Sequence, residues 1–169
     1  MATIEFGDFD AYQKALESLY KDTEGIVKQA VYKGAGIVAD EIKNNLEALP
    51  IQEGKNGLPP IGTPENPLTG VSRRQKGDLI NAFGLAPIEK DGDYIQTKPG
   101  VDGYGSVKTK KYPNGVPNAM LMRSIESGTS FRKKHPVFRS AVTKARKRAE
   151  SAMQKEIDDA LQRKFEQRR

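Results

Sequence analysis

The chain has 169 residues, 36% of them hydrophobic and 30% charged, which predicts a single domain over residues 1–169 with a small hydrophobic core. It contains no cysteine, and this excludes disulfides, thiolate zinc sites and cysteine nucleophiles. The net charge of +6 is uneven, because residues 132–169 hold 13 of the 28 Lys and Arg residues but only 5 of the 22 Asp and Glu residues, a bias typical of chains with a polyanionic or acidic partner.

Two helices are predicted in the N-terminal third, where apolar residues recur every three or four positions. The first, within residues 1–22, begins after Asp8 as N-cap and carries Phe9, Tyr12, Leu16 and Leu19 on one side. The second runs from Thr23 to Leu49. Its apolar stripe consists of Ile26, Ala30, Val31, Ala35, Val38, Ile42, Leu46 and Leu49. Gly34 and Gly36 each cost this helix ~1 kcal/mol relative to alanine, so we expect another backbone to approach closely there.

A long loop is predicted over residues 50–72, because five prolines and four glycines fall between Pro50 and Gly70. Loops of this length inside a compact domain are usually functional or disordered. Two readings remain open. The loop is either a mobile surface excursion or a segment that becomes ordered against a neighbouring subunit.

The middle of the chain predicts a short helix and a β-region. Residues 76–83 favour a helix that buries Leu79, Ile80 and Phe83. Within the β-region, residues 84–112, Asp91-Gly92 separates two alternating runs and predicts an antiparallel hairpin. Val101 and residues 105–109 are expected to add a third strand or ribbon, and residues 113–115 a further turn.

Two helices are predicted near the C-terminus. The shorter, residues 118–127, should bury Met120, Leu121 and Ile125, with Met122 as a further candidate. Gly128 should end it with a positive φ in a left-handed cap. Pro136 suits the first turn of a final helix over residues 136–167. The predicted inner face of this helix comprises Phe138, Ala141, Val142, Ala145, Ala149, Ala152, Met153, Ile157, Ala160 and Leu161.

Residues that could perform chemistry are few. His135 is the only histidine, and its position beside Pro136 favours a role at the helix entry over a role as base or ligand. We therefore predict no enzyme activity, no cofactor and no metal. No stretch approaches the ~20 apolar residues of a membrane span, and Met1 to Gly7 lack the features of a secretory signal, so no membrane partner is expected.

The basic residues of the C-terminal part allow two interpretations. They form either a solvated helix face or a contact with DNA or an acidic protein. No motif for reading bases accompanies them, so only weak, non-specific DNA contact is expected. The candidate contact residues are Arg132, Lys133, Lys134, Arg139, Arg146, Lys147 and Arg148.

Residues 125–129, Ile-Glu-Ser-Gly-Thr, and residues 135–141, His-Pro-Val-Phe-Arg-Ser-Ala, are followed by a charged amphipathic helix. In this order they resemble the minor tail-component family of long-tailed bacteriophages, which acts at the head–tail connection (neck or tail completion). The match is close over residues 125–141 and extends in element order over 24–165. The chain departs from the family pattern in separating Thr69-Gly70 from residues 77–80 by six residues.

The resemblance implies an α+β fold in which long N-terminal and C-terminal helices pack on one face of a small antiparallel β-sheet. It also implies a ring oligomer in the virion, with other neck or tail proteins as partners, and no catalysis. The residues expected to form a structural hinge are Glu126, Gly128, Thr129, Pro136 and Phe138. The alternative is a nucleic-acid-binding module that uses the basic C-terminal helix, and an enzyme is the weakest reading.

Overall fold

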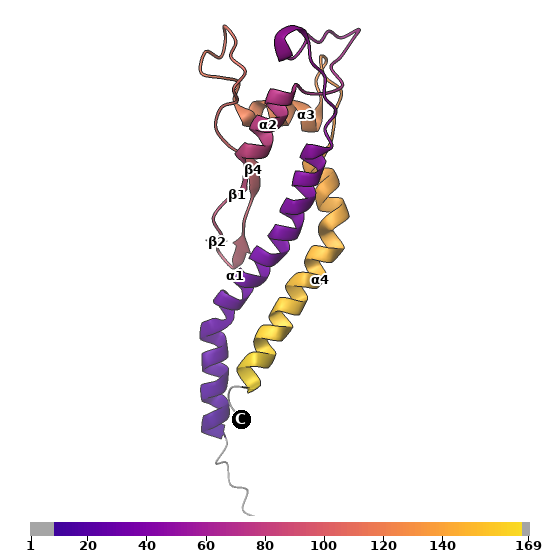
Figure 1. Ribbon diagram of the computed structural model, residues 1–169. Coiled ribbons are helices and arrows are strands. Elements are labelled where there is room, and N and C mark those ends of the chain that lie inside the picture. The colour runs from indigo at the N-terminus through magenta and orange to yellow at the C-terminus, as the bar shows by residue number, and fades with distance from the viewer. Residues whose placement is uncertain (1–8, 167–169) are drawn as a thin grey trace, which may run out of the picture.

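The computed structural model describes residues 9–166, with the side chains of most residues in 9–21 and of Phe165 left aside. It is an elongated α-hairpin that carries a cluster of small elements at one end (Figure 1). The predicted cap at Asp8 and the apolar side chains of the first predicted helix lie outside this description. Within the described part, no helix combines the length and apolarity needed to cross a membrane.

A single helix, α1 (Phe9–Glu47), replaces the two helices predicted at the N-terminus. The prediction of a break with Thr23 as a second N-cap was therefore wrong. Gly25 lowers helix propensity without stopping a helix, and packing against a neighbouring helix outweighs that cost. The neighbouring helix is α4 (Val137–Glu166), which lies beside α1 along most of the length of α4 (Figure 1).

Ion pairs follow the antiparallel register of α1 and α4. Lys33 Nζ lies 2.6 Å from Glu156 Oε2, and a Lys164–Asp22 pair joins the helices further toward the free end of the hairpin. The apolar seam between the pairs is narrow, because α4 contributes mainly alanine. Its fully or largely buried alanines are Ala141, Ala145, Ala149 and Ala160.

The two glycines inside α1 have different surroundings. A Cβ on Gly34 would lie 2.6 Å from the side chain of Met153 and 3.6 Å from the backbone oxygen of Ala149, both in α4, so the backbone of α4 comes near Gly34 but the closest contact is made by a side chain. A Cβ on Gly36 would meet no atom within 4 Å. The same expectation was therefore wrong for Gly36, which faces an open groove described below.

The main hydrophobic core lies at the end of the hairpin where the other elements gather. It joins the last turns of α1 to α2 (Arg73–Ala82), α3 (Asn118–Ser127) and the start of α4. The buried members of this core are Ile42, Leu46, Leu49, Val71, Leu79, Val101, Leu121, Met122, Ile125, Val137 and Ala141. Met120 and Val142, both predicted inside, are each 46% exposed, because they lie on the outer sides of α3 and α4.

The α2 helix begins three residues before the predicted start. Ser72 Oγ accepts a hydrogen bond from Gln75 N and the Gln75 side chain accepts one from Ser72 N, a capping box that fixes the first turn. The helix ends at Ala82, so Phe83 begins the first strand. Leu79 is fully buried as predicted.

The predicted α+β class is confirmed, with helices packed against a small set of antiparallel strands. These strands form two ribbons. The first pairs β1 (Phe83–Leu85) with β4 (Pro99–Val101), and the second pairs β2 (Glu89–Asp91) with β3 (Tyr94–Gln96). Of the two long helices, α1 makes most of the contacts with the strands, whereas α4 packs mainly on α1 and reaches β1 through Phe138.

The β2–β3 ribbon is the predicted hairpin, and Gly92 in its turn has φ +59°. An ion pair between Lys90 and Glu24, at 2.9 Å, joins the ribbon to α1. Hydrogen bonds from Lys28 and then Lys90 lower the pKa of the Glu24 carboxyl to about 2. The ribbon is thus held against α1 by charge at its tip.

The third strand predicted over residues 105–109 is absent from the described structure. The segment is held by other partners, since Ser106 N and Oγ both donate to Asp78 Oδ2, at 2.7 and 2.9 Å. Gly105 N donates to Val116 O and Val116 N donates to Val107 O, so these residues form a compact loop against α2 and α3. Val101 is in a strand as predicted.

Candidate assembly interface

Glu126 connects the end of α3 to the start of α4. Its Oε2 accepts a hydrogen bond from Phe138 N at 2.9 Å, and its Oε1 accepts one from Arg139 N at 3.0 Å. These are free N–H groups of the first turn of α4, where a negative charge is also favoured by the helix dipole. Glu126 therefore acts as an N-terminal cap supplied from a different helix.

Replacing Glu126 with alanine should destabilise the protein by about 1–2 kcal/mol, the range for a lost helix cap with a charge at the N-terminus. Urea unfolding followed by circular dichroism measures this change. The matched control is Glu150→Ala, since Glu150 pairs with Arg146 on the solvent side of α4 and should contribute little. Equal effects of the two substitutions would contradict the capping role.

Gly128 reverses the chain after α3 with φ +73° and ψ 170°. The positive φ confirms the prediction, but the ψ value lies outside the left-handed helical region that was expected for the cap. Gly128 N still donates to Ser124 O at 3.0 Å, which satisfies one of the last carbonyls of α3. This combination of angles is essentially restricted to glycine.

Thr129 closes a tight turn with Arg132, because each backbone N–H donates to the other residue's carbonyl, at 2.9 and 3.2 Å. The turn then pairs with the 50–72 loop. Leu68 N donates to Phe131 O and Lys133 N donates to Leu68 O, both at 2.8 Å. Residues 126–138, called the hinge segment here, are therefore joined to the 50–72 loop by backbone hydrogen bonds.

Arg132 is buried, with 8% of its surface exposed, and its Nη1 donates to Gly70 O. Burial lowers the pKa of its guanidinium below the usual value. The structure corrects the prediction that Arg132 contacts a partner or DNA, since it fixes the base of the 50–72 loop. Its neighbours Lys133 and Lys134 are exposed.

The residues that precede α4 hold the same loop. His135 Nε2 lies 2.7 Å from Thr69 O, and His135 N donates to Ile125 O at 2.7 Å. Helix α4 begins at Val137, one residue after the predicted start, so Pro136 lies directly before the helix and not in its first turn. His135 therefore links the 50–72 loop to the end of α3 at the helix entry.

Phe138 lies in the first turn of α4 and is partly buried against the core. Its ring packs edge-on against Phe83 of β1, with centroids 6.1 Å apart and an interplanar angle of 64°. Aromatic pairs favour this arrangement. The contact connects α4 to the β1–β4 ribbon.

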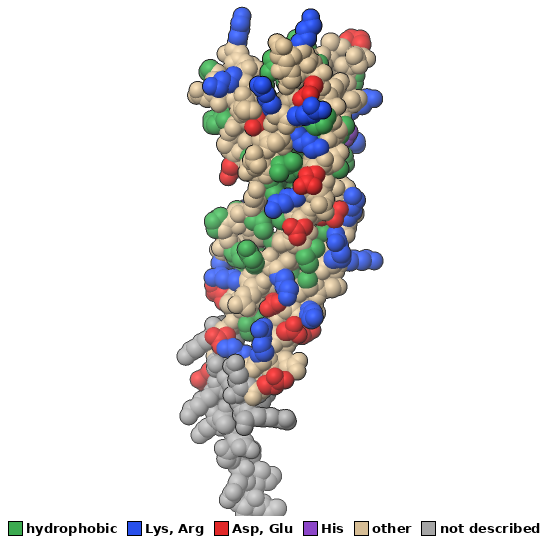
Figure 2. Space-filling view, in the orientation of Figure 1, with side chains coloured by type: hydrophobic (Ala, Val, Ile, Leu, Met, Phe, Trp, Pro, Cys, Tyr) green, Lys and Arg blue, Asp and Glu red, His purple; other side chains and the backbone are tan. Residues whose placement is uncertain are grey.

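Most of the candidate basic residues on α4 face carboxylates. Arg148 Nη2 lies 2.8 Å from Glu41 Oε2, and Lys144 approaches the other oxygen of the same carboxylate at 3.6 Å. Arg146 pairs with Glu150 at 2.8 Å. Lys147 is exposed. Acidic and basic side chains are also interspersed over the side of the molecule that Figure 2 shows.

Loop residues 57–64 project from the unit described above and are called the loop tip here. They include no charged residue. Ile61 is 93% exposed and Leu58 42% exposed. Nearby Phe131 is 51% exposed. Large apolar side chains gathered on a surface mark interaction sites.

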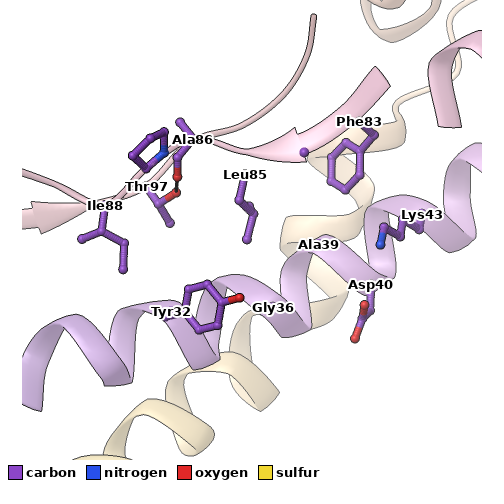
Figure 3. Close-up of a pocket in the computed structure, with 12 residues that line it drawn as sticks. Tyr32, Gly36, Ala39, Asp40, Lys43, Phe83, Leu85, Ala86, Ile88 and Thr97 are labelled. Carbon is purple, nitrogen blue, oxygen red and sulfur yellow. Dashed lines mark hydrogen bonds between the residues drawn. The ribbon is translucent and has the colours of Figure 1, made fainter. Parts of the chain in front are cut away.

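A groove separates α1 from the strand segments, and we call it the α1–ribbon groove. One part, of about 540 Å³, is lined on the α1 side by Tyr32, Gly36, Ala39, Asp40 and Lys43. Its other wall comprises Phe83, Gly84, Leu85, Ala86, Pro87, Ile88 and Thr97. Figure 3 shows Leu85 and Ile88 pointing from the strand side toward α1. A second hollow continues the groove along α1 and shares Tyr32, Gly36, Asp40 and Ile88 with the first.

Within residues 9–166, no group of three or more His, Asp or Glu side chains is placed to hold a metal ion. The structure does bring together three features: the α3–α4 junction capped by Glu126, the 50–72 loop bonded to Arg132 and His135, and the apolar α1–ribbon groove.

In comparisons with known proteins, no family model, curated protein or solved structure matches this chain.

Proposed function

We propose that this chain is a structural virion protein of a bacteriophage or prophage, acting in head–tail joining or tail completion at the neck through contacts between subunits. The resemblance of residues 125–141 to the neck and tail-completion family supports this proposal. The observation that carries it is the junction built by the same residues. Glu126, Gly128 and His135 fix α3, α4 and the 50–72 loop to one another.

A rigid junction that displays an apolar loop suits assembly. Arg132 and the backbone of Leu68 hold the base of the loop, so Ile61 is presented from a fixed support. A presented group loses less conformational freedom on binding than a flexible one, which increases affinity for a given contact. The proposed role uses this geometry to repeat one contact between identical subunits in a ring.

Nucleic-acid binding is less well supported. Duplex DNA is bound mainly by unpaired lysine and arginine side chains that neutralise phosphates. Here Arg139, Arg146 and Arg148 each face a carboxylate, and Arg132 is buried. A DNA ligand would have to displace these internal partners, which lowers the expected affinity.

Deletion of the gene from the phage or prophage that encodes it tests the proposal. We expect filled heads and complete tails that remain unjoined, seen by electron microscopy, with a loss of infectious particles. A plasmid copy of the wild-type gene should restore infection, and so should a copy carrying Gly25→Ala, which alters an open position of α1. Normal infectious virions from the deletion strain would reject the neck function.

A further inference from the structure

We propose that the loop tip of one copy, residues 57–64, docks into the α1–ribbon groove of a second copy. This contact rests on the ring assembly proposed above and names the two surfaces that would form it. Three observations support it. The α1–ribbon groove is apolar and is not filled by any other described part of the same chain. The loop tip is uncharged and exposed. Glu65 next to the tip and Lys43 at the groove carry opposite charges.

The groove is open and apolar where it passes Gly36. No atom lies within 4 Å of the position that a Gly36 Cβ would occupy, and Tyr32 beside it is 66% exposed. Leu85 and Ile88 form the opposite wall. A hydrogen bond of 2.6 Å from Thr97 Oγ1 to Ala86 O holds this wall in place, so the groove is formed before any ligand arrives.

The loop tip is preorganised. Gly54 N donates to Leu58 O at 2.7 Å, and Thr63 and Asn66 exchange hydrogen bonds of 3.1 and 3.2 Å on the other side of Ile61. Three of the eight tip residues are prolines, whose fixed φ limits the freedom that binding removes. A Cβ on Gly62 would come within 2.3 Å of Phe131 O, so the tip also rests on the hinge segment.

Charge complementarity favours a second copy as the occupant. Glu65 is exposed four residues after Ile61, and Lys43 is exposed in the wall of the groove at its Phe83 end. Asp40 belongs to the same wall, but its carboxylate points away from the strand side (Figure 3). When Ile61 enters the groove, these two side chains can pair at its edge. The pair would add a modest attraction and a preferred orientation to the apolar contact.

The two surfaces occupy different parts of the molecule. The 50–72 loop extends beyond the C-terminal end of α1 (Figure 1). The groove is lined by α1 residues from Tyr32 to Lys43 and by the strand segments opposite them. Each copy can therefore offer its tip to one neighbour and its groove to another. Such a head-to-tail contact generates a closed ring when the rotation between neighbours closes on itself.

Cross-linking tests the contact directly, because the wild-type chain has no cysteine. Chains carrying Ile61→Cys are mixed with chains carrying Ile88→Cys and treated with a short bismaleimide at high protein concentration. We expect mixed dimers on denaturing gels, and a ladder of multimers from a chain carrying both substitutions. The matched control mixes Ile61→Cys with Val142→Cys, an exposed position on α4 away from the groove. Equal yields in the two mixtures would overturn the proposal, as would the absence of mixed dimers.

Charge reversal provides the second measurement. Glu65→Lys should lower the yield of the Ile61–Ile88 cross-link roughly two- to fivefold, as expected for an exposed ion pair. Lys43→Glu in the partner chain should restore it. If neither substitution changes the cross-link yield, the assigned orientation is wrong. Multimers of the unmodified chain in sedimentation, without this cross-link, would reject the docking contact and leave the neck function to the deletion experiment.

Discussion

Replacing Gly128 with valine should destabilise the protein by about 3 kcal/mol or more. A backbone with positive φ and extended ψ costs a residue other than glycine on the order of 1–3 kcal/mol, and a β-branched side chain fares worst. A Cβ there would also lie 3.1 Å from Lys134 N and 3.2 Å from Arg132 O. Urea unfolding at equilibrium measures the loss, and the hinge segment cannot relax freely because the 50–72 loop is bonded to it.

The matched control for this substitution is Gly25→Ala. Gly25 lies inside α1 and no atom occurs within 4 Å of its missing Cβ. Alanine should therefore raise the free energy of unfolding by up to about 1 kcal/mol, because it lowers the backbone entropy of the unfolded chain. A Gly128→Val variant as stable as the wild type would show that the turn adopts another conformation in solution.

The elements that could be predicted best depend on short-range signals. The bounds of α3, residues 118–127, match the structure, and so does the positive φ of Gly128. The hairpin around Gly92 was equally clear, since an Asp-Gly between alternating runs constrains only its immediate neighbours. In these cases the residues that decide the structure are adjacent in the chain.

The break predicted at Thr23 is absent from α1 because tertiary packing outweighs the local sequence preference for a helix boundary. Thr23 and Gly25 favour a helix boundary when only their neighbours are considered. In the fold, the burial of Ile26 and Ala30 in a helix that packs against α4 extends α1 across this point. Such support comes from residues more than a hundred positions away and has no signature at Thr23.

The start of α2 was missed although its signal was present. Ser72 and Gln75 have the spacing of a capping box, which predicts a helix beginning at Arg73. The apolar residues from Leu79 onward mark only the second half of the helix, because the buried residue of its first half, Gln75, is polar. The cap would have given the correct boundary.

The roles within the candidate interface were harder to predict than its position. Glu126 was predicted to belong to a structural hinge, but its contact with the N-terminus of α4 joins groups 12 and 13 residues apart across a turn, and this contact has no local signature. Arg132 looked like its exposed neighbours Lys133 and Lys134, because the sequence cannot show that the 50–72 loop covers it. The pairing of Arg148 with Glu41 likewise depends on the register of two distant helices.

Replacing Phe138 with alanine should destabilise the protein by about 3 kcal/mol. This value is the lower end of the usual range for a core phenylalanine, because the ring is only partly buried. The loss combines the apolar area that leaves the core with the edge-on contact to Phe83, which connects α4 to the β1–β4 ribbon. The midpoint of urea unfolding, with an unchanged slope, provides the measurement.

Val142→Ala is the matched control, since Val142 lies one turn further along α4 and was predicted to share the inner face with Phe138. It is 46% exposed, so its truncation should change the free energy of unfolding by no more than about 0.5 kcal/mol. A loss below about 1 kcal/mol for Phe138→Ala would mean that the start of α4 is not docked on the ribbon. Phe138 N also donates a hydrogen bond to Glu126, so the packing of the Phe138 ring and the capping of α4 depend on each other. The double variant with Glu126→Ala should therefore lose less free energy of unfolding than the sum of the losses in the two single variants.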